Sequence, residues 1–230
     1  MDSTRHRQPT SDAAGDTAGD QGAADDDAEL FWERHYRTPR TWGTRVNPLL
    51  AETATPLDPG AALDLGCGAG GDALWLAQRG WHVTAVDIST TAVERVRDRA
   101  RDLGVADRVV TAQHDLGRSF PAGRFDLVSA QYFHTPLPLL RSRVLSNAAR
   151  ALRPGGLLLI VDHGSTAPWS WNQDPDIHFP TPTETAAELD LDPALWSVLR
   201  ADMPRRRATG PAGETATVID NVLLVQHTVR

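Results

Sequence analysis

The sequence predicts one α/β domain, in which a mostly parallel sheet ends in an antiparallel hairpin and carries helices on both faces. Three observations lead to this fold class. Short apolar runs alternate with helical patterns from residue 61 to residue 161. The runs are apolar throughout, which is typical of parallel strands covered on both faces. Two long stretches near the carboxyl end are joined by a short turn, which favours an antiparallel pair.

Length and composition fit a single domain of this class. The chain has 230 residues, 40% apolar and 23% charged, which is enough for one complete core. Residues 1–27 differ, because they hold seven Asp and two Arg and almost no large apolar side chain, so −5 of the net charge of −7 lies there. We expect a disordered acidic tail there, or an acidic interaction arm, and a folded domain over residues 28–230.

Charge, cysteine content and hydropathy disfavour several classes of function. The Arg residues at 95–101 and 205–207 are the only basic runs in a nearly neutral body, so a nucleic-acid surface is not expected. Cys67 is the only cysteine, which rules out a disulfide within the chain and a thiolate metal cluster. No apolar stretch is long enough for a membrane span, and we expect a cytoplasmic protein without a membrane partner.

The first elements lie before the alternating region. Residues 29–37 predict a short helix with an apolar face. Asn47 is expected to cap a second helix that begins at Pro48, since Asn is a favoured N-cap and Pro is tolerated at the first helical position. We expect residues 28–60 to form an N-terminal helical lid.

The alternating region supplies the parallel strands and their helices. The strands are expected at residues 61–65, 82–87, 108–113, 125–130 and 157–161. The helices are expected at residues 72–79, 91–103 and 139–152. Gly80 and Gly104 mark helix ends, and Thr91 with Glu94 has the spacing of a capping box.

The carboxyl end departs from this rhythm. Thr181 to Glu184 has the pattern of a capped helix start. Residues 196–203 and 217–228 predict two long strands, and residues 207–213, which include Gly210 and Pro211, predict the turn between them.

A glycine-rich turn joins the first strand of the alternating region to its first helix. Gly66, Gly68 and Gly70 allow a tight bend and the close approach of a ligand to the backbone. Asp87 ends the next strand, where a carboxylate can accept hydrogen bonds from both hydroxyls of a ribose. Together these features predict a ligand that contains adenosine.

Two kinds of adenosine ligand fit these residues. The spacing of Gly66, Gly68 and Gly71 matches G-x-G-x-x-G, which occurs in nicotinamide dehydrogenases. Asp64, however, lies where a carboxylate can orient an ammonium group, and Asp72 would oppose a pyrophosphate but not a sulfonium. The terminal hairpin is also foreign to the ordinary dinucleotide-binding half. These points favour S-adenosylmethionine.

At these residues the sequence resembles the class I S-adenosylmethionine-dependent methyltransferases. Residues 63–70 (Leu-Asp-Leu-Gly-Cys-Gly-Ala-Gly) carry most of the resemblance, and residues 83–89, 125–128 and 152–158 extend it. The resemblance implies a Rossmann-like, seven-stranded sheet. A closer likeness, to the tellurite-resistance and thiopurine-type methyltransferases, rests on Phe31-Trp32, Trp42, Asn47-Pro48 and Gly71-Asp72-Ala73.

The resemblance also implies which residues bind the cofactor. Asp87 would hold the ribose hydroxyls, Ile88 would pack on the adenine, and Asp115 would accept from its amino group. Gln131 would lie at the methionine end. The full set is Asp64, Gly66, Cys67, Gly68, Gly70, Asp87, Ile88, Asp115, Leu116 and Gln131.

The methyl acceptor is expected over the carboxyl ends of the parallel strands. His134 follows the fourth strand and is our candidate for a general base, with a structural histidine as the alternative, and Tyr132 is a second catalytic candidate. Residues 164–182 are expected to form a substrate cap. The candidate acceptor-binding residues are Trp32, Tyr36, Trp42, His163, Trp169 and His178.

The sequence thus predicts in-line methyl transfer from S-adenosylmethionine to a small-molecule acceptor, by a monomer or a homodimer. No metal site is expected, because the spacing of His134, His163 and His178 matches no known ligand pattern. Two alternatives remain at this point: an NAD(P)-dependent oxidoreductase, and a regulator that binds S-adenosylmethionine without catalysis.

Overall fold

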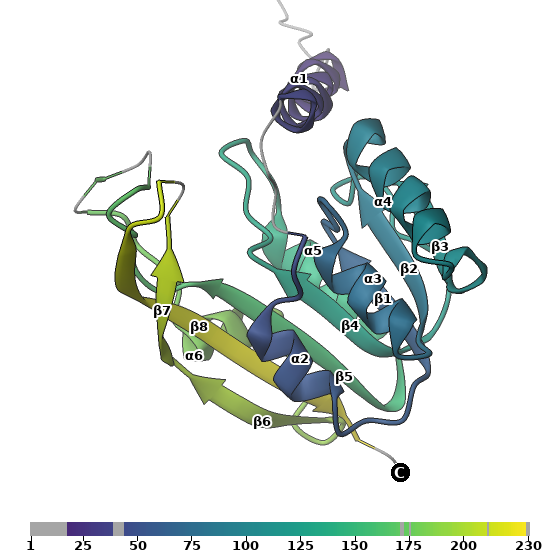
Figure 1. Cartoon of the computed structure of the whole chain (residues 1–230). Coiled ribbons are helices and arrows are strands. Elements are labelled where there is room, and N and C mark those ends of the chain that lie inside the picture. Colours follow the sequence, from purple (N-terminus) through teal and green to yellow (C-terminus); the bar gives the residue numbers. More distant parts are fainter. Residues whose placement is uncertain (1–17, 39–43, 171–172, 175, 211, 229–230) are drawn as a thin grey trace, which may run out of the picture.

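The strands of the protein form one mixed sheet with helices on both of its faces (Figure 1). The computed structural model describes residues 18–38, 44–170, 173–174, 176–210 and 212–228. In this part of the chain the sheet has eight strands, seven of them in the order β3-β2-β1-β4-β5-β8-β6, and β7 pairs with β8. The predicted fold class is confirmed, and β7 is an eighth strand that the sequence did not predict.

The first five strands are parallel to one another. They are β1 (Ala61–Leu65), β2 (His82–Asp87), β3 (Val109–Gln113), β4 (Phe125–Gln131) and β5 (Leu152–His163). β1 pairs with β2 on one side and with β4 on the other, so the strand order reverses between β1 and β4. Ligands of open α/β sheets bind at the carboxyl ends of the strands at such a reversal.

The last three strands are antiparallel to their neighbours. They are β6 (Trp196–Asp202), β7 (Arg205–Thr209) and β8 (Thr215–His227). The predicted turn at 207–213 is therefore corrected. Residues up to Thr209 still pair with β8, because β6 and β7 are one long segment that bends near Pro204 and follows the same partner strand.

Six α-helices and one short 3-10 helix lie among the described residues. They are α1 (Ala18–Arg37), α2 (Pro48–Ala54), α3 (Gly71–Gln78), α4 (Thr90–Asp102), η1 (Ala106–Arg108), α5 (Arg141–Arg150) and α6 (Pro182–Leu189). Asn47 caps α2, and Thr181 with Glu184 forms the capping box of α6, as predicted. The capping box predicted at Thr91 is wrong, because the Ser89 side chain caps α4 instead. None of the described helices is long and apolar enough to cross a membrane.

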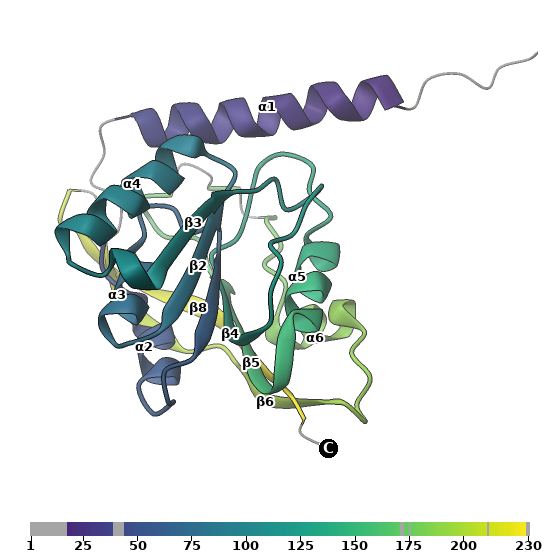
Figure 2. The ribbon, with the colours of Figure 1, turned by 90° about the vertical axis from the view of Figure 1, so that its right-hand side faces the viewer.

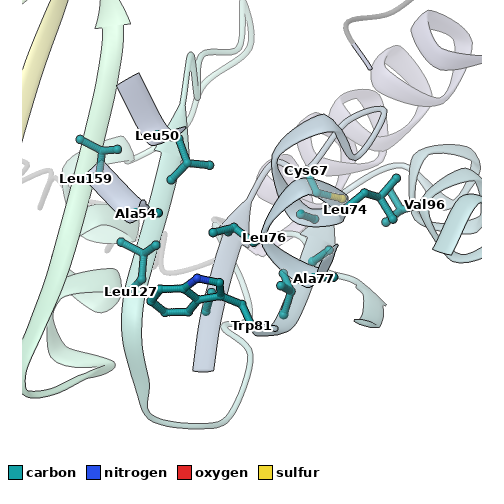
Figure 3. Close-up of a cluster of buried hydrophobic side chains, with 14 of the residues drawn as sticks. Leu50, Ala54, Cys67, Leu74, Leu76, Ala77, Trp81, Val96, Leu127 and Leu159 are labelled. Carbon is teal, nitrogen blue, oxygen red and sulfur yellow. The ribbon is translucent and has the colours of Figure 1, made fainter. Parts of the chain in front are cut away.

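The sheet separates two apolar clusters. Leu50 of α2, Leu76 of α3 and Val96 of α4 pack on one face, which also includes Leu127 and Leu159. Figure 3 shows Cys67, Leu74 and Val96 close together at one end of this cluster. Helices α5 and α6 cover the other face, where Val128 and Leu158 point. Alternate side chains of β4 and β5 therefore point into the two apolar clusters, so both faces of these strands are covered.

The first helix is longer than predicted. It begins at Ala18, so it continues through residues 18–27 of the segment that composition predicts to be disordered. Residues 18–27 contain three alanines, and alanine is the best helix former, which favours the extension. In Figure 2, α1 lies across the top of the molecule beside α4. Residues 1–17 lie outside the described part.

Candidate cofactor and active site

The turn between β1 and α3 has left-handed backbone at each predicted glycine. The φ angles are +68° at Gly66, +50° at Gly68 and +79° at Gly70, and residues that carry a Cβ rarely adopt such values. The Cys67 amide donates a 2.9 Å hydrogen bond to the Val86 carbonyl and ties the turn to the end of β2. The sequence therefore places bare backbone where β1 and β2 end.

Two cavities adjoin over this turn. The larger has a volume of about 830 Å³ and the smaller about 350 Å³, and Tyr36, Gly66 and Tyr132 border both. The larger cavity extends from the end of β2 to the loop after β4. The smaller one lies between the glycine turn and the start of α2. A ligand that contacts Gly66 can therefore reach into both spaces.

Asp87 points at the glycine turn from the end of β2. Its Oδ2 accepts a 3.0 Å hydrogen bond from the Gly68 amide, and its Oδ1 accepts one of 3.0 Å from the Ser89 amide. Burial raises the pKa of Asp87 to about 6, and the amide hydrogen bonds oppose this rise. The side chain is thus fixed at the border of the larger cavity, where a ribose hydroxyl can donate to it.

Two more carboxyl groups, those of the buried Asp64 and the half-buried Asp72, stand next to the smaller cavity. Asp72 Oδ1 accepts a 2.6 Å hydrogen bond from the Asn47 amide, and burial raises the pKa of Asp72 to about 6. Burial and the charges of Asp72 and Asp87 raise the pKa of Asp64 well above its usual range. Asp64 Oδ2 is buried without a hydrogen-bond partner among the described residues. Such a cluster would repel a pyrophosphate and attract a cation.

The start of α2 completes the smaller cavity. Asn47 caps α2 with its side-chain oxygen, and its Nδ2 donates a 2.8 Å hydrogen bond to Gln131 Oε1. Gln131 Nε2 in turn donates to Ser129 Oγ at 2.9 Å. Asn47 therefore begins helix α2, binds Asp72 through its backbone amide and orients Gln131, the residue predicted at the methionine end.

Tyr132 lies at the junction of the two cavities with a left-handed φ of +50°, which is uncommon for a residue other than glycine. Its hydroxyl donates to Asp220 Oδ1 at 3.0 Å and accepts from Arg206 at 2.9 Å. Arg206 also donates to Asp220 at 2.5 Å. Burial and the Asp220 charge raise the pKa of Tyr132 to about 12, so the phenol keeps its proton at neutral pH.

His134 borders the larger cavity and is paired with a buried carboxylate. Its Nε2 lies 3.2 Å from Asp162 Oδ1. Arg141 donates to both oxygens of Asp162, at 2.7 and 2.6 Å. His163 stacks on Tyr132 with 4.4 Å between the ring centroids. Partial burial lowers the pKa of His163, as does the neighbouring His134.

Comparison with known proteins favours one of the two adenosine ligands. Residues 62–156 match the family model of a methyltransferase domain. The fold also matches a protein solved in work on the conversion of a disulfide bond into a thioacetal group during echinomycin biosynthesis. That match has a TM-score of 0.65 at 25% identity and covers 87% of this chain and 91% of that one. Residues 62–156 are therefore similar to a methyltransferase domain. S-adenosylmethionine is the cofactor that this similarity indicates.

The curated relatives of this methyltransferase domain differ in what they act on. The chain is 38% identical over 137 residues to 27-O-demethylrifamycin SV methyltransferase of Amycolatopsis mediterranei, covering 57% of this chain and 49% of that protein. It is 32% identical over 131 residues to ribosomal RNA small subunit methyltransferase C of Alcanivorax borkumensis, covering 55% of this chain and 39% of that protein. The chain spans about half the length, or less, of these relatives.

Most of the predicted cofactor residues of the methyltransferase domain border a cavity. Those on the larger cavity are Gly66, Asp87, Ile88, Asp115 and Leu116, and those on the smaller one are Asp64, Gly66, Cys67, Gly68 and Gln131. Gly70, also predicted to bind the cofactor, borders neither cavity. A Cβ there would lie 2.7 Å from the Val96 side chain, so this glycine serves the packing of α3 on α4. The buried Cys67 thiol likewise belongs to the apolar cluster (Figure 3).

The predicted acceptor residues are only partly brought together. Trp32 and Tyr36 border the larger cavity with Tyr132 and His134. His163, Trp169 and His178 are not among the described residues that line either cavity. His178 is exposed beside Glu184 at the start of α6, 3.5 Å away, because the segment before α6 leads away from the glycine turn. Trp42 lies outside the described residues.

Four polar residues of the site were not predicted as functional. Asp162 and Asp220 are the buried carboxylates behind His134 and Tyr132, and Arg141 and Arg206 neutralise them. A signal was present for Asp220, because it is the only acidic residue of the mostly apolar stretch that forms β8. The guanidinium partners come from distant elements, which no local pattern connects.

Proposed function

We propose that this protein transfers the methyl group of S-adenosylmethionine to a small-molecule acceptor by in-line displacement. The observation that carries the proposal is the buried, unpartnered Asp64 oxygen in a group of three carboxyls beside the glycine turn. An α-ammonium group would satisfy that oxygen, and a sulfonium would be stabilised near the same negative charges. A nicotinamide dinucleotide would bring negative charge to the same place, which disfavours the oxidoreductase.

The residues present fit this cofactor. Gly66 and Gly68 leave the backbone bare, and a Cβ at Gly68 would come within 3.0 Å of the Tyr36 hydroxyl. Asp64 and Gln131 would hold the methionine end, and Asp87 the ribose. Ile88 and Leu116 would pack against the adenine, with Asp115 as the acceptor for its amino group. When bound, S-adenosylmethionine supplies a methyl group on a sulfonium that leaves without acid catalysis.

The acceptor would occupy the part of the larger cavity beyond Tyr132. Apolar side chains from Leu137 to Leu140 and from Trp32 and Phe133 line it, so it suits an apolar or aromatic molecule. Alignment of the acceptor with the methyl group can supply roughly 7–11 kcal/mol of the rate enhancement. The protein therefore needs mainly to orient the acceptor and to exclude water.

His134 would take a proton from an acceptor that must lose one. Asp162 would orient its ring, in the way that a buried carboxylate orients a catalytic histidine. Tyr132 would orient the acceptor as a hydrogen-bonding phenol, since its raised pKa makes it a poor base at neutral pH.

A small-molecule acceptor is favoured over RNA. The chain has a net charge of −7, whereas binding of phosphates needs clustered positive charge. One relative is named as a methyltransferase of 27-O-demethylrifamycin SV and the other as a methyltransferase of ribosomal RNA, so the names of similar proteins include both acceptor classes.

The test is transfer of label from methyl-labelled S-adenosylmethionine to a panel of phenols, thiols, heteroaromatic amines and tellurite. We expect at least one acceptor to be labelled by the wild type, and its labelling to fall at least tenfold in His134→Gln if the acceptor must be deprotonated. His82→Gln, at the exposed start of β2, is the matched control. Cofactor binding without labelling of any acceptor would favour the regulator instead.

A further inference from the structure

Helix α1 is attached to helix α4 through Glu33. Its Oε2 accepts a 2.7 Å hydrogen bond from the Ser89 hydroxyl and one of 3.2 Å from the Thr91 amide. Its Oε1 accepts a hydrogen bond from the Thr91 hydroxyl. Only 17% of the Glu33 side chain is exposed. The carboxylate thus sits at the N-terminus of α4, where the free amides and the helix dipole favour a negative charge.

Ser89 connects this contact to the cofactor site. Its hydroxyl donates to Glu33 and caps α4 by accepting from the Ala92 amide at 3.2 Å. Its backbone amide donates to Asp87 Oδ1 at 3.0 Å. The residue that fixes the proposed ribose-binding carboxylate therefore also holds the side chain that attaches α1.

The two aromatic residues flanking Glu33 reach the cavities. Trp32 and Tyr36 lie four residues apart, on one side of α1, and both border the larger cavity. The Trp32 indole donates to Thr135 Oγ1 at 3.3 Å, across the cavity mouth from α4. Arg95 of α4 donates to the Tyr36 carbonyl at 2.9 Å. Glu33 of α1 is bound to the start of α4, and this contact therefore helps to fix where both rings lie.

We infer that Glu33 is a positioning residue for cofactor retention: it holds α1 on α4, so that Trp32 and Tyr36 close over the bound cofactor. The inference rests on the proposed function in that the retained ligand is S-adenosylmethionine. Glu33 acts through Ser89 and Thr91 and does not border either cavity itself. If only the attached state retains the cofactor, the apparent affinity falls in proportion to the fraction of molecules in which α1 is attached.

The decisive variant is Glu33→Gln, which keeps the size of the side chain and removes its charge. Because hydrogen bonds to a charged carboxylate are stronger than those to an amide, we expect the dissociation constant of S-adenosylhomocysteine to rise about tenfold, mainly through faster dissociation. Calorimetry and stopped-flow displacement measure this on the full chain. Glu94→Gln makes the same change at an exposed position of α4 and should bind like the wild type.

Trypsin provides a second readout, because Arg34 and Arg37 lie in α1. We expect S-adenosylhomocysteine to slow cleavage at these sites in the wild type and to protect Glu33→Gln much less. Thr91→Val removes the contact from the other helix. Combined with Glu33→Gln it should add little further loss of affinity, since both changes break one interaction.

Equal affinity of the wild type and Glu33→Gln would overturn the inference, as would losses in the two single variants that simply add. A wild type that does not bind S-adenosylhomocysteine would instead overturn the proposed function. Circular dichroism of each variant separates a loss of attachment from a loss of the fold.

Discussion

At the scale of single residues, the site concentrates negative charge that the folded protein does not neutralise. Asp64 and Asp87 are buried and Asp72 is half-buried close to the glycine turn, and desolvation raises the pKa of all three. A carboxyl group with a raised pKa binds its proton more tightly in the folded chain than in the unfolded chain. Ionisation above that pKa therefore costs stability until a cationic ligand compensates for it.

Asp72→Asn tests this cost. In the cofactor-free protein we expect the free energy of unfolding at pH 7.5 to rise by on the order of 1 kcal/mol, because the amide removes a buried charge but can still accept from Asn47. Below about pH 3 the wild-type carboxyl is largely protonated in both states, so the gain should disappear. Urea unfolding at both pH values measures it.

The exposed Asp107→Asn is the control and should show no such gain. A variant that is less stable than the wild type at pH 7.5, or equally changed at both pH values, would contradict the assigned cause.

At the scale of elements, a residue that caps the start of a helix can also hold part of the site in place. Asn47 and Thr181 both cap helices with a proline at the start. Only Asn47 also binds Gln131 and Asp72 at the smaller cavity. The sequence predicted both caps from the same pattern, but it could not distinguish their roles, because Gln131 is far away along the chain.

Asn47→Ala should therefore lower both stability and cofactor affinity, whereas Thr181→Ala should lower stability alone. Loss of an N-cap costs about 1 kcal/mol, which thermal unfolding can measure in each variant. Calorimetry with S-adenosylhomocysteine should show a weakening of several-fold in Asn47→Ala only. Equal affinities for S-adenosylhomocysteine in the two variants would show that the Asn47 side chain does not contribute to cofactor binding.

The terminal hairpin also belongs to the site. Arg206 of β7 neutralises Asp220 of β8, and both hold the Tyr132 hydroxyl. The guanidinium is partly exposed, with 36% of its side chain accessible, whereas only 1% of the Asp220 side chain is. Removal of the Arg206 guanidinium would leave the buried Asp220 carboxylate without a cationic partner.

Arg206→Met should accordingly destabilise the protein by about 1–3 kcal/mol in urea unfolding, below the range for a fully buried pair because solvent screens the arginine. Arg205→Met, at the exposed neighbouring position of β7, should change little. If Arg206→Met were as stable as Arg205→Met, the pair of Arg206 with Asp220 would not contribute to the stability of the fold.

Elements with a single strong pattern were the most predictable from the sequence. β1 and β2 have the predicted bounds, because each is an apolar run bordered by glycine or by a charged residue. β7 was missed, since Arg205 to Thr209 is polar and its only partner is β8. The start of α1 was missed because its first half consists of small and acidic residues, which fit a tail as well as a helix.

At the scale of the whole molecule, topology and cofactor turn followed from local patterns, and the acceptor end did not. The glycine turn and Asp87 are read directly from two strands and their ends. The groups behind Tyr132 and His134 come from α5, β7 and β8, which meet only in the folded protein. Glu33 was equally hidden, because its partners lie more than fifty residues away on α4.

The measurement that tests the central claim most directly is calorimetric titration of the full chain with S-adenosylhomocysteine and, separately, with NAD⁺ and NADP⁺. We predict one binding site in the micromolar range or tighter for S-adenosylhomocysteine, about ten- to hundredfold weaker binding in Asp87→Asn, and no binding of either dinucleotide. No heat from S-adenosylhomocysteine at millimolar concentration, or tighter binding of a dinucleotide, would contradict the account.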